Sequence, residues 1–154
     1  VADTEGIIAL CEGLKGSAVT SLDLLNNSLG DGADAILSVA SEMPQITSLC
    51  GIQPEQTDMD FTQRGLDAAD AKLLAFDLSR NQSVRTVNLR GNKIGDEGAS
   101  ALAAVLKETQ IQQLDLDSTM LCGIDGYTCQ GTYTAEGITK LCEGLKGSCV
   151  TSLR

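Results

Sequence analysis

The chain has 154 residues, of which 42% are apolar and 21% charged, so it suits one folded domain and is too short for a duplicated enzyme. Its formal net charge of −10 opposes binding to nucleic-acid phosphates and to anionic membrane surfaces, and we expect neither as a partner. Aromatic residues make up only 3% and Trp is absent, so the core must be built from Leu, Ile, Val and Ala.

The residue types needed for metal binding and catalysis are scarce. There is no His, and the six cysteines form no CxxC pair, so we expect no metal site. Without His, the usual general base for a Ser or Cys nucleophile is missing. No phosphate-binding or dinucleotide-binding glycine motif occurs either. We therefore predict that the chain is not an enzyme and uses no cofactor.

The sequence predicts neither a membrane span nor a leader. No apolar run approaches 18 residues, and the start lacks a charged segment followed by an apolar one. We therefore expect a cytoplasmic protein whose cysteines are reduced and pack as small apolar residues.

The first predicted element is a helix over 5–16, and an equivalent helix is predicted over 136–147. The two segments share the octapeptide LCEGLKGS, which begins at residue 10 and again at residue 141. Gly16 and Gly147 stand where C-terminal caps are needed. Apolar residues at helical spacing should face a sheet at the same positions of both helices: Ile7, Leu10, Cys11 and Leu14, and Ile138, Leu141, Cys142 and Leu145.

Short strands with one buried face are predicted after these and other helices. The segments SLDLLNNSL, DMDFTQRGL, TVNLRGNKI and QLDLDSTML begin at residues 21, 58, 86 and 113, and a fifth begins at residue 152. Each complete segment has apolar residues at the same three offsets, and the first two of these alternate as in a strand. The step from Met59 to Val87 is 28 residues and the step from Val87 to Leu114 is 27.

The clearest unit continues from its strand into a helix within GDEGASALAAVLKET, residues 95–109. Ala99, Leu102, Val105 and Leu106 fall at helical spacing, and Asp96 is placed to cap the N-terminus. A second helix is predicted in the same place of its unit, over 67–78. Each unit is therefore a strand, a turn and a helix.

The line VNLRGNKIGDEGASALAAVLKE, residues 87–108, resembles the ribonuclease-inhibitor-like class of leucine-rich repeat proteins. The resemblance implies an α/β fold, a solenoid shaped as a partial horseshoe, with a parallel concave sheet and outer helices. It implies a single array of about four to five units over 1–154, cut from a longer repeat array. Asn27 and Asn92 stand at the asparagine-ladder position, where the amide can satisfy backbone groups at the end of a strand. Arg64 and Thr119 replace Asn in the other two units.

The segment 46–57 is irregular, because the step from Leu22 to Met59 is 37 residues. ITSL at 46–49 matches VTSL at 19–22, so both 46–52 and 58–62 are candidates for the second strand. The two cannot be adjacent parallel strands, because a parallel crossover needs a dozen or more residues. We favour 58–62, which keeps the next helix at its regular spacing.

A second irregularity is an insertion over 118–133, which carries Tyr127 and Tyr133 together with Cys122 and Cys129. The simpler interpretation is a loop that packs its aromatic side chains on its own repeat. The alternative is a loop that presents them to a partner, since long loops in regular scaffolds often carry function. A disulfide between the two cysteines would require an oxidising compartment.

Side chains that alternate with the buried ones should point out from the strands and form a partner-binding face. The charged and amide residues among them are Asp23, Asp58, Asp60, Asn88, Arg90, Asp115 and Asp117. This face is acidic with a basic residue at its middle, and a basic protein surface would complement it. The alternative is a polar face that only keeps the array soluble. A cation between the carboxylates is disfavoured, because an Asn88 and Arg90 strand separates them.

The predicted function is a non-catalytic scaffold that binds a partner protein on the acidic concave face and on the 118–133 loop. Two alternatives remain: a regulator that activates a small GTPase, as some proteins of this repeat class do, and a purely structural spacer. The fragment lacks polar caps at its ends, so self-association through those ends is also expected. The exposed residues do not name the partner.

Overall fold

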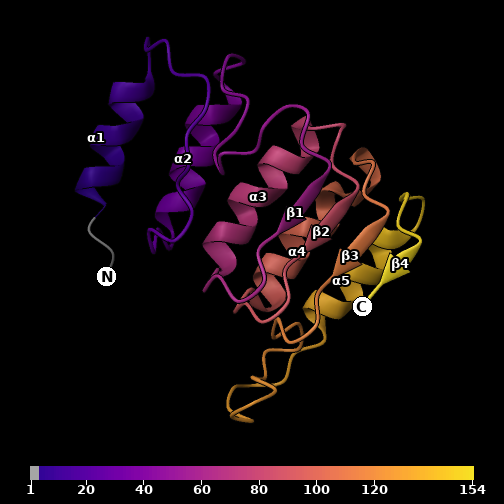
Figure 1. The fold of residues 1–154 in the computed structure, drawn as a ribbon. Helices are drawn as coiled ribbons and strands as arrows, with labels where there is room; N and C mark the ends of the chain where they lie inside the picture. The colour runs from indigo at the N-terminus through magenta and orange to yellow at the C-terminus, as the bar shows by residue number, and fades with distance from the viewer. Residues whose placement is uncertain (1–3) are drawn as a thin grey trace.

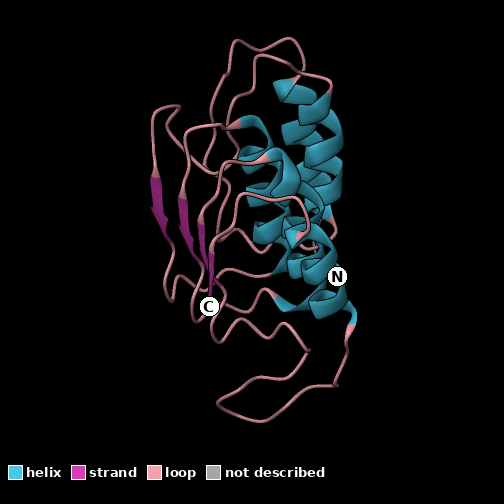
Figure 2. Cartoon of the chain, turned by 90° about the vertical axis from the view of Figure 1, so that its right-hand side faces the viewer, coloured by secondary structure: helices cyan, strands magenta, loops and turns pink. Residues whose placement is uncertain are grey.

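The computed structural model describes residues 4–154, and these form two layers, with helices on one side and parallel strands on the other (Figures 1 and 2). The sheet has the order β1-β2-β3-β4, and each neighbouring pair is parallel. Its strands are β1 (Asp58–Asp60), β2 (Thr86–Asn88), β3 (Gln113–Asp115) and β4 (Ser152–Leu153). The helices are α1 (Glu5–Leu14), α2 (Gly32–Ser41), α3 (Ala68–Arg80), α4 (Gly95–Val105), the 3₁₀ turn η1 (Leu106–Glu108) and α5 (Glu136–Leu145). The predicted α/β repeat with parallel strands is confirmed.

The core lies between the two layers and follows the sequence period. Met59, Val87, Leu114 and Leu153 occupy one row across the four strands, and the first three are at most 4% exposed. Each unit adds an apolar residue after its strand and others from its helix, such as Ile94 and Leu102 in the regular unit. Full burial of a side chain of this size contributes about 1.5–3 kcal/mol, so the repeated offsets specify the fold.

The N-terminus of α4 differs from the prediction. The helix begins at Gly95, so Asp96 lies inside its first turn and its side chain caps nothing. It still favours the helix, because a carboxylate near an N-terminus interacts well with the helix dipole. The side-chain cap occurs instead on α3, where Asp67 accepts from the backbone N–H of Asp70 and the Asp70 side chain accepts from that of Asp67.

Both candidate strands of the irregular segment have a place in the structure. Residues 58–60 form β1, inside the favoured range. Residues 47–51 pair with the first unit: the N–H of Thr47 donates to the carbonyl of Thr20 (2.7 Å), and the N–H of Leu22 donates to that of Ser48 (2.9 Å). The expectation of five adjacent strands is therefore wrong, because within 4–154 the strand around residue 22 bridges to 48 and not to β1. Leu49 follows Leu22 by one 27-residue period, so residues 47–51 take the place of the second strand. The few residues between Leu49 and β1 are too short to form the helix that normally separates two strands.

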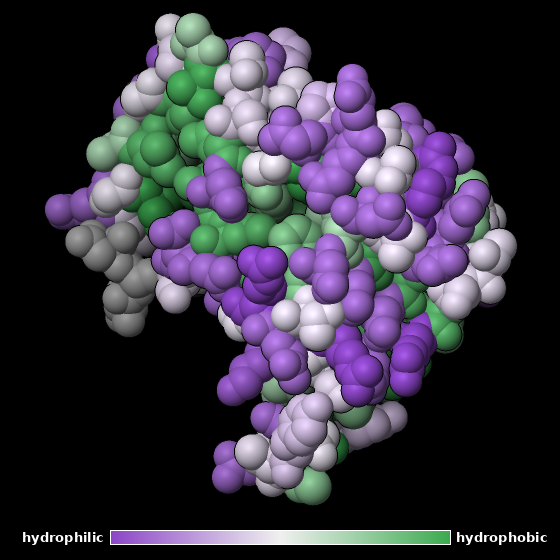
Figure 3. Space-filling view, in the orientation of Figure 1, coloured by the Kyte–Doolittle hydropathy of each residue, from purple (hydrophilic) through white to green (hydrophobic). Residues whose placement is uncertain are grey.

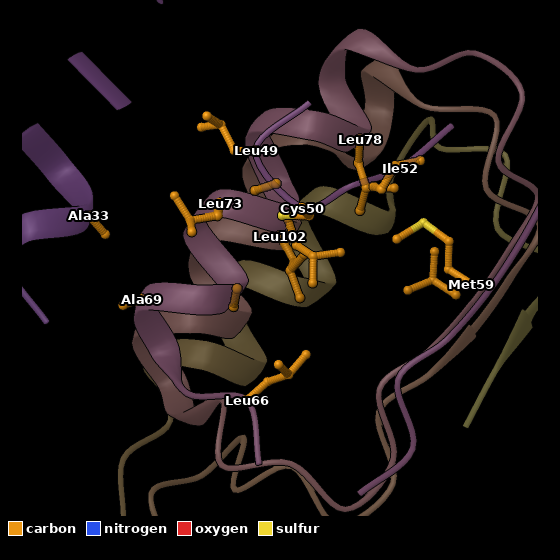
Figure 4. Close-up of a cluster of buried hydrophobic side chains, with 14 of the residues drawn as sticks. Ala33, Leu49, Cys50, Ile52, Met59, Leu66, Ala69, Leu73, Leu78 and Leu102 are labelled. Atoms are coloured by element: carbon orange, nitrogen blue, oxygen red, sulfur yellow. The ribbon is translucent and has the colours of Figure 1, made fainter. Parts of the chain in front are cut away.

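Helix α3 holds this extra segment in place through a buried carboxylate. Asp77, only 1% exposed, accepts hydrogen bonds from the hydroxyl of Ser48 (2.6 Å) and from the backbone N–H groups of Leu49 (2.7 Å) and Cys50 (3.0 Å). Around these bonds, Leu49 and Cys50 are buried in the same apolar cluster as α3 residues (Figure 4). Asp77 thereby links the first unit to the regular units.

The two helices with the shared octapeptide are packed differently. Cys11 of α1 is buried, as predicted, but the equivalent Cys142 of α5 is exposed, and Ile138 is 41% exposed. The prediction for these two α5 residues is wrong because α2 lies against α1, whereas no helix of residues 4–154 covers the outer side of α5 (Figure 1). Among the described residues, none of the helices has the length and apolar character needed to cross a membrane.

Candidate functional site

The open face of the sheet collects most of the predicted partner-binding residues. The strands alternate as expected: the middle residue of β1, β2 and β3 is buried, and its neighbours are exposed or half-buried. The parallel register places Asp60 beside Asn88 and Asn88 beside Asp115, and Arg154 follows at the end of β4. In Figure 3, polar residues cover this side of the sheet, whereas an apolar area lies over the first unit at the upper left.

Each of these carboxylate or amide side chains is fixed by the backbone that follows it. One Oδ1 atom accepts from the N–H two residues later: Asp60 from Thr62 (3.0 Å), Asn88 from Arg90 (3.1 Å) and Asp115 from Asp117 (2.9 Å). Such local bonds favour a turn at the end of a strand. The recurrence of Asp or Asn at this offset therefore has a structural cause, and only the second side-chain atom remains for a ligand.

The turn also affects the acidity of the site. Hydrogen bonds from the hydroxyl and the backbone N–H of Thr62 lower the pKa of Asp60, so its carboxyl stays ionised at neutral pH. Arg90 is not a free cation, because its Nε lies 3.1 Å from Oδ2 of Asp117. The face thus presents four carboxylates, at 58, 60, 115 and 117, against the guanidinium groups of Arg90 and Arg154.

A shallow hollow of about 190 Å³ lies on this face between β2, β3 and β4. Its polar lining comes from Asn88, Gln113, Asp115, Ser152 and Arg154, among others. A hollow of this size accepts a side chain but not a drug-sized molecule, for which pockets of about 300–1,000 Å³ are usual. Within residues 4–154, no group of three or more His, Cys, Asp or Glu residues is arranged to hold a metal ion.

Asp23 does not join the other predicted residues. It belongs to the strand of the first unit, which pairs with 47–51 and lies outside the four-stranded sheet. Its Oδ1 accepts from the N–H of Leu25 (3.2 Å), so it makes the same turn as Asp60 but outside the four-stranded sheet. The placement of Asp23 on the common face was wrong, because the sequence did not show which strand lies next to it.

The 118–133 insertion ends in a small hairpin that extends beyond the repeats (Figures 1 and 2). Ile124 bridges to Gly131, and the N–H of Asp125 donates to the carbonyl of Gln130 (2.9 Å). Tyr127 and Tyr133 are 76% and 64% exposed, so the interpretation in which the loop packs its aromatic rings on its own repeat is wrong. Cys122 and Cys129 are both free thiols.

The two predicted ladder asparagines differ. Asn92 is 1% exposed and joins two units: it donates to the carbonyls of Leu89 and Phe61 and accepts from the N–H groups of Arg64 and Leu66. Asn27 is exposed and donates only within its own turn, to the carbonyls at 24 and 25. Asn27 thus completes its own turn, and Asn92 is the residue that bridges neighbouring units.

Sequence reasoning missed Asp70 and Asp77, the buried carboxylates of α3. Asp70 accepts from the N–H of Asn26 (3.0 Å), so both side chains reach back to the first unit. Burial raises the pKa of both carboxyls, although the hydrogen bonds they accept act in the opposite direction. The only signal in the sequence was their seven-residue spacing, which places two acidic residues on one face of a largely apolar helix.

Comparison with known proteins gives consistent matches. A family model described as Leucine Rich repeat matches residues 80–103. NACHT, LRR and PYD domains-containing protein 3 of Macaca mulatta is 32% identical over 114 residues, which is 73% of this chain and 10% of that protein. The Homo sapiens protein of the same name is 31% identical over 114 residues, with the same two shares of 73% and 10%. NACHT, LRR and PYD domains-containing protein 5 of Bos taurus is 30% identical over 129 residues, 80% of this chain and 11% of that protein. The chain thus spans about a tenth of the length of the curated relatives it matches.

Proposed function

Because this chain belongs to the leucine-rich repeat proteins, we propose that it is a non-catalytic module that binds a basic segment of a partner protein on the open face of the sheet. A role in protein interaction is what the family supports. We further propose that this face is the concave side of a ribonuclease-inhibitor-like solenoid. We also propose that the protein is cytoplasmic, where its cysteines stay reduced.

The observation that carries the proposal is the set of pre-oriented carboxylates. Asp60 and Asp115 each use Oδ1 for the turn, which restricts the side chain before any partner arrives. Binding then costs less side-chain entropy than it would for freely rotating carboxylates. Four strands at about 4.8 Å spacing give a strip of roughly 15–20 Å, which fits a short segment of a partner rather than a whole domain.

The hairpin that follows β3 is proposed as a second contact. Tyr127 and Tyr133 lie on it with most of their surface exposed, and tyrosine is enriched at protein interfaces. The hairpin follows β3 directly, through the turn at 117–121.

The experiment uses a fluorescein-labelled peptide of alternating Lys and Gly as the probe, titrated in fluorescence anisotropy at about 0.1 M salt. The test variant is Asp60→Asn with Asp115→Asn, because Asn keeps the turn bond, as Asn88 shows. An exposed ion pair is worth about 0.2–1 kcal/mol, so two lost carboxylates should weaken binding by roughly two- to thirtyfold.

The matched control is Glu42→Gln with Glu108→Gln, which changes the net charge by the same two units at the ends of α2 and η1. It should bind the probe within about twofold of the parent chain. An equal loss in both variants would mean that only the overall charge attracts the peptide, and the proposed face would be rejected. Titrating GTP hydrolysis by small GTPases with the chain tests the regulatory alternative, which predicts faster hydrolysis.

A further inference from the structure

Strand β1 has an outer edge on which no other strand is paired. The N–H of Phe61 donates to the carbonyl of Asn88 (2.8 Å), so the odd-numbered residues of β1 direct their backbone groups to β2. Backbone groups alternate between the two edges of a strand, and those of Asp58 and Asp60 therefore point to the outer edge. The carbonyl of Asp58 accepts from the side chain of Gln56 (3.0 Å). Within residues 4–154, the N–H groups of Asp58 and Asp60 have no acceptor.

This edge is open because of the irregular segment, and not because the chain begins nearby. The unit that precedes β1 is present, and its segment 47–51 takes the place of the second strand. The N–H groups of Leu49 (2.7 Å) and Cys50 (3.0 Å) donate to Asp77, while carbonyl groups of the same segment accept from the first unit. The segment therefore does not pair with β1, and the four-stranded sheet starts at β1 although the first unit lies beyond it (Figure 1).

An apolar side chain is less covered at this edge than its equivalents are. Phe61, Leu89 and Leu116 occupy the same position after β1, β2 and β3. Leu89 is 0% exposed and Leu116 is 4% exposed, whereas Phe61 is only half-buried. Both β2 and β3 have a paired strand on each side, and β1 has one on a single side. Phe61 therefore offers apolar surface next to the unpaired N–H groups.

The same edge is acidic. Asp58 and Asp60 are exposed and lie two residues apart, so their side chains point to the same face of the sheet. Hydrogen bonds from Thr62 lower the pKa of Asp60, whose carboxyl is therefore ionised at neutral pH. Arg64 acts on Asp60 as well, but one guanidinium group does not balance two carboxylates. Like charges would oppose each other if two copies of this edge paired, so the edge favours a basic segment over a second copy of itself.

We propose that an extended basic segment of a partner protein pairs with the outer edge of β1 and adds a strand to the sheet there. The inference rests on the proposed function and specifies how the basic segment is held. Side chains alternate along an added strand, so the segment carries basic residues at every second position, opposite Asp58 and Asp60. Apolar residues between them lie on the side of Phe61. Backbone hydrogen bonds then supply affinity, and the alternate side chains supply specificity.

The first experiment tests the backbone hydrogen bonds with modified peptides. The probe is a fluorescein-labelled peptide of alternating Lys and Val, titrated in fluorescence anisotropy with the 154-residue chain. Two further peptides carry N-methyl groups, one on the Val and the other on the Lys nitrogens, and both keep the charge of the probe. Only alternate residues of a paired strand direct their N–H groups to β1, so one methylated peptide should bind at least about tenfold more weakly and the other within about threefold of the probe. A parallel strand uses the Val groups, and an antiparallel strand uses the Lys groups.

The second experiment removes one N–H from β1 itself. Asp58→Pro deletes the outward N–H and leaves the bonds to β2, because the backbone groups of residue 58 face away from β2. Asp58→Asn is the matched control, since it removes the same charge and keeps the N–H. The proline variant should bind the unmethylated probe at least about fivefold more weakly than the asparagine variant. Circular dichroism should show the same helix content in both, and the peptide comparison stands independently of the proline variant.

The outcomes distinguish this inference from the proposed function. If both methylated peptides bind like the probe while Asp60→Asn with Asp115→Asn weakens binding, the face holds basic segments by charge alone and the added strand is rejected. Equal weakening by both methylated peptides, or equal binding by Asp58→Pro and Asp58→Asn, would also reject it. A probe that does not bind the parent chain would overturn the proposed function together with this inference.

Discussion

Replacing Asp77 by Ala should detach the first unit from the rest of the chain. The substitution leaves the buried N–H of Leu49 and the buried hydroxyl of Ser48 without their carboxylate acceptor, while the N–H of Cys50 keeps only its bond to Ser48 Oγ (3.2 Å). Each unsatisfied buried group costs about 1–3 kcal/mol, but removing the carboxylate also relieves its own burial, so we expect a net loss of about 2–4 kcal/mol. That is a large part of the roughly 5–15 kcal/mol that typically stabilises a domain.

The assay is urea unfolding followed by far-UV circular dichroism, since the chain has no Trp to report by fluorescence. Asp34→Ala on α2 is the control: its side chain is 63% exposed and pairs with Lys72, so its loss should cost under about 1 kcal/mol. Hydrogen exchange should become faster first at the amides of residues 47–51, because this segment loses its link to α3 while β2 to β4 keep their pairing. Equal stabilities of Asp77→Ala and Asp34→Ala would refute the role given to Asp77.

Two other changes test the same network of buried polar groups. Asp77→Asn should destabilise the chain less at neutral pH than at about pH 3.5, because burial raises the carboxyl pKa above its ordinary value of 3.8 in the folded chain. The parent therefore loses stability as pH rises from 3.8 through the folded pKa, and its advantage over the uncharged variant becomes smaller. Urea unfolding at the two pH values measures this, and an advantage that grows with pH would contradict the sign. Asn92→Ala should lower the free energy of unfolding by about 2–4 kcal/mol, because backbone groups in two units lose their hydrogen-bond partner. Asn27→Ala should lower it by under about 1 kcal/mol. Comparable losses in urea unfolding would show that Asn92 does not join the units.

The regular units could be predicted because each of them buries apolar residues at the same positions of its strand, turn and helix. Val87, Leu89 and Ile94 recur at fixed offsets, and each offset corresponds to a position that faces the layer of helices. The sequence therefore located β1 to β4 and all of the helices it named to within a few residues. Helix ends were less certain, as Asp96 shows, because a capping residue is recognised by a local bond and not by a period.

The attachment of the first unit could not be predicted in the same way. It depends on the bond between Ser48 and Asp77, which are 29 residues apart and obey no repeated pattern. An acidic residue on a helix is usually solvated, so the seven-residue spacing of Asp70 and Asp77 is too weak a signal to place Asp77 in the core. The strand around residue 22 was consequently assigned to the wrong neighbour, and Asp23 was placed in a sheet to which it does not belong.

The candidate site shows how one pattern can have two causes. Asp or Asn after each strand was visible in the sequence and was assigned to partner binding, but the structure gives it a turn-forming bond first. The exchange of Asp for Asn at residue 88 keeps that bond and removes the charge. The charges at 60 and 115 are therefore more than the turn requires, and this excess is the part of the pattern that the binding proposal explains.

The octapeptide LCEGLKGS shows that helix formation and burial have different causes. Eight identical residues form the same helix end in α1 and α5, so local sequence determines the helix. Their burial differs, with Cys11 enclosed and Cys142 exposed, because burial is determined by the neighbouring helix. Gly13 shows the reverse: it is open, whereas Gly144 is packed on α4. The two copies of one sequence thus show that the same residue is buried or exposed according to which described helix lies beside it.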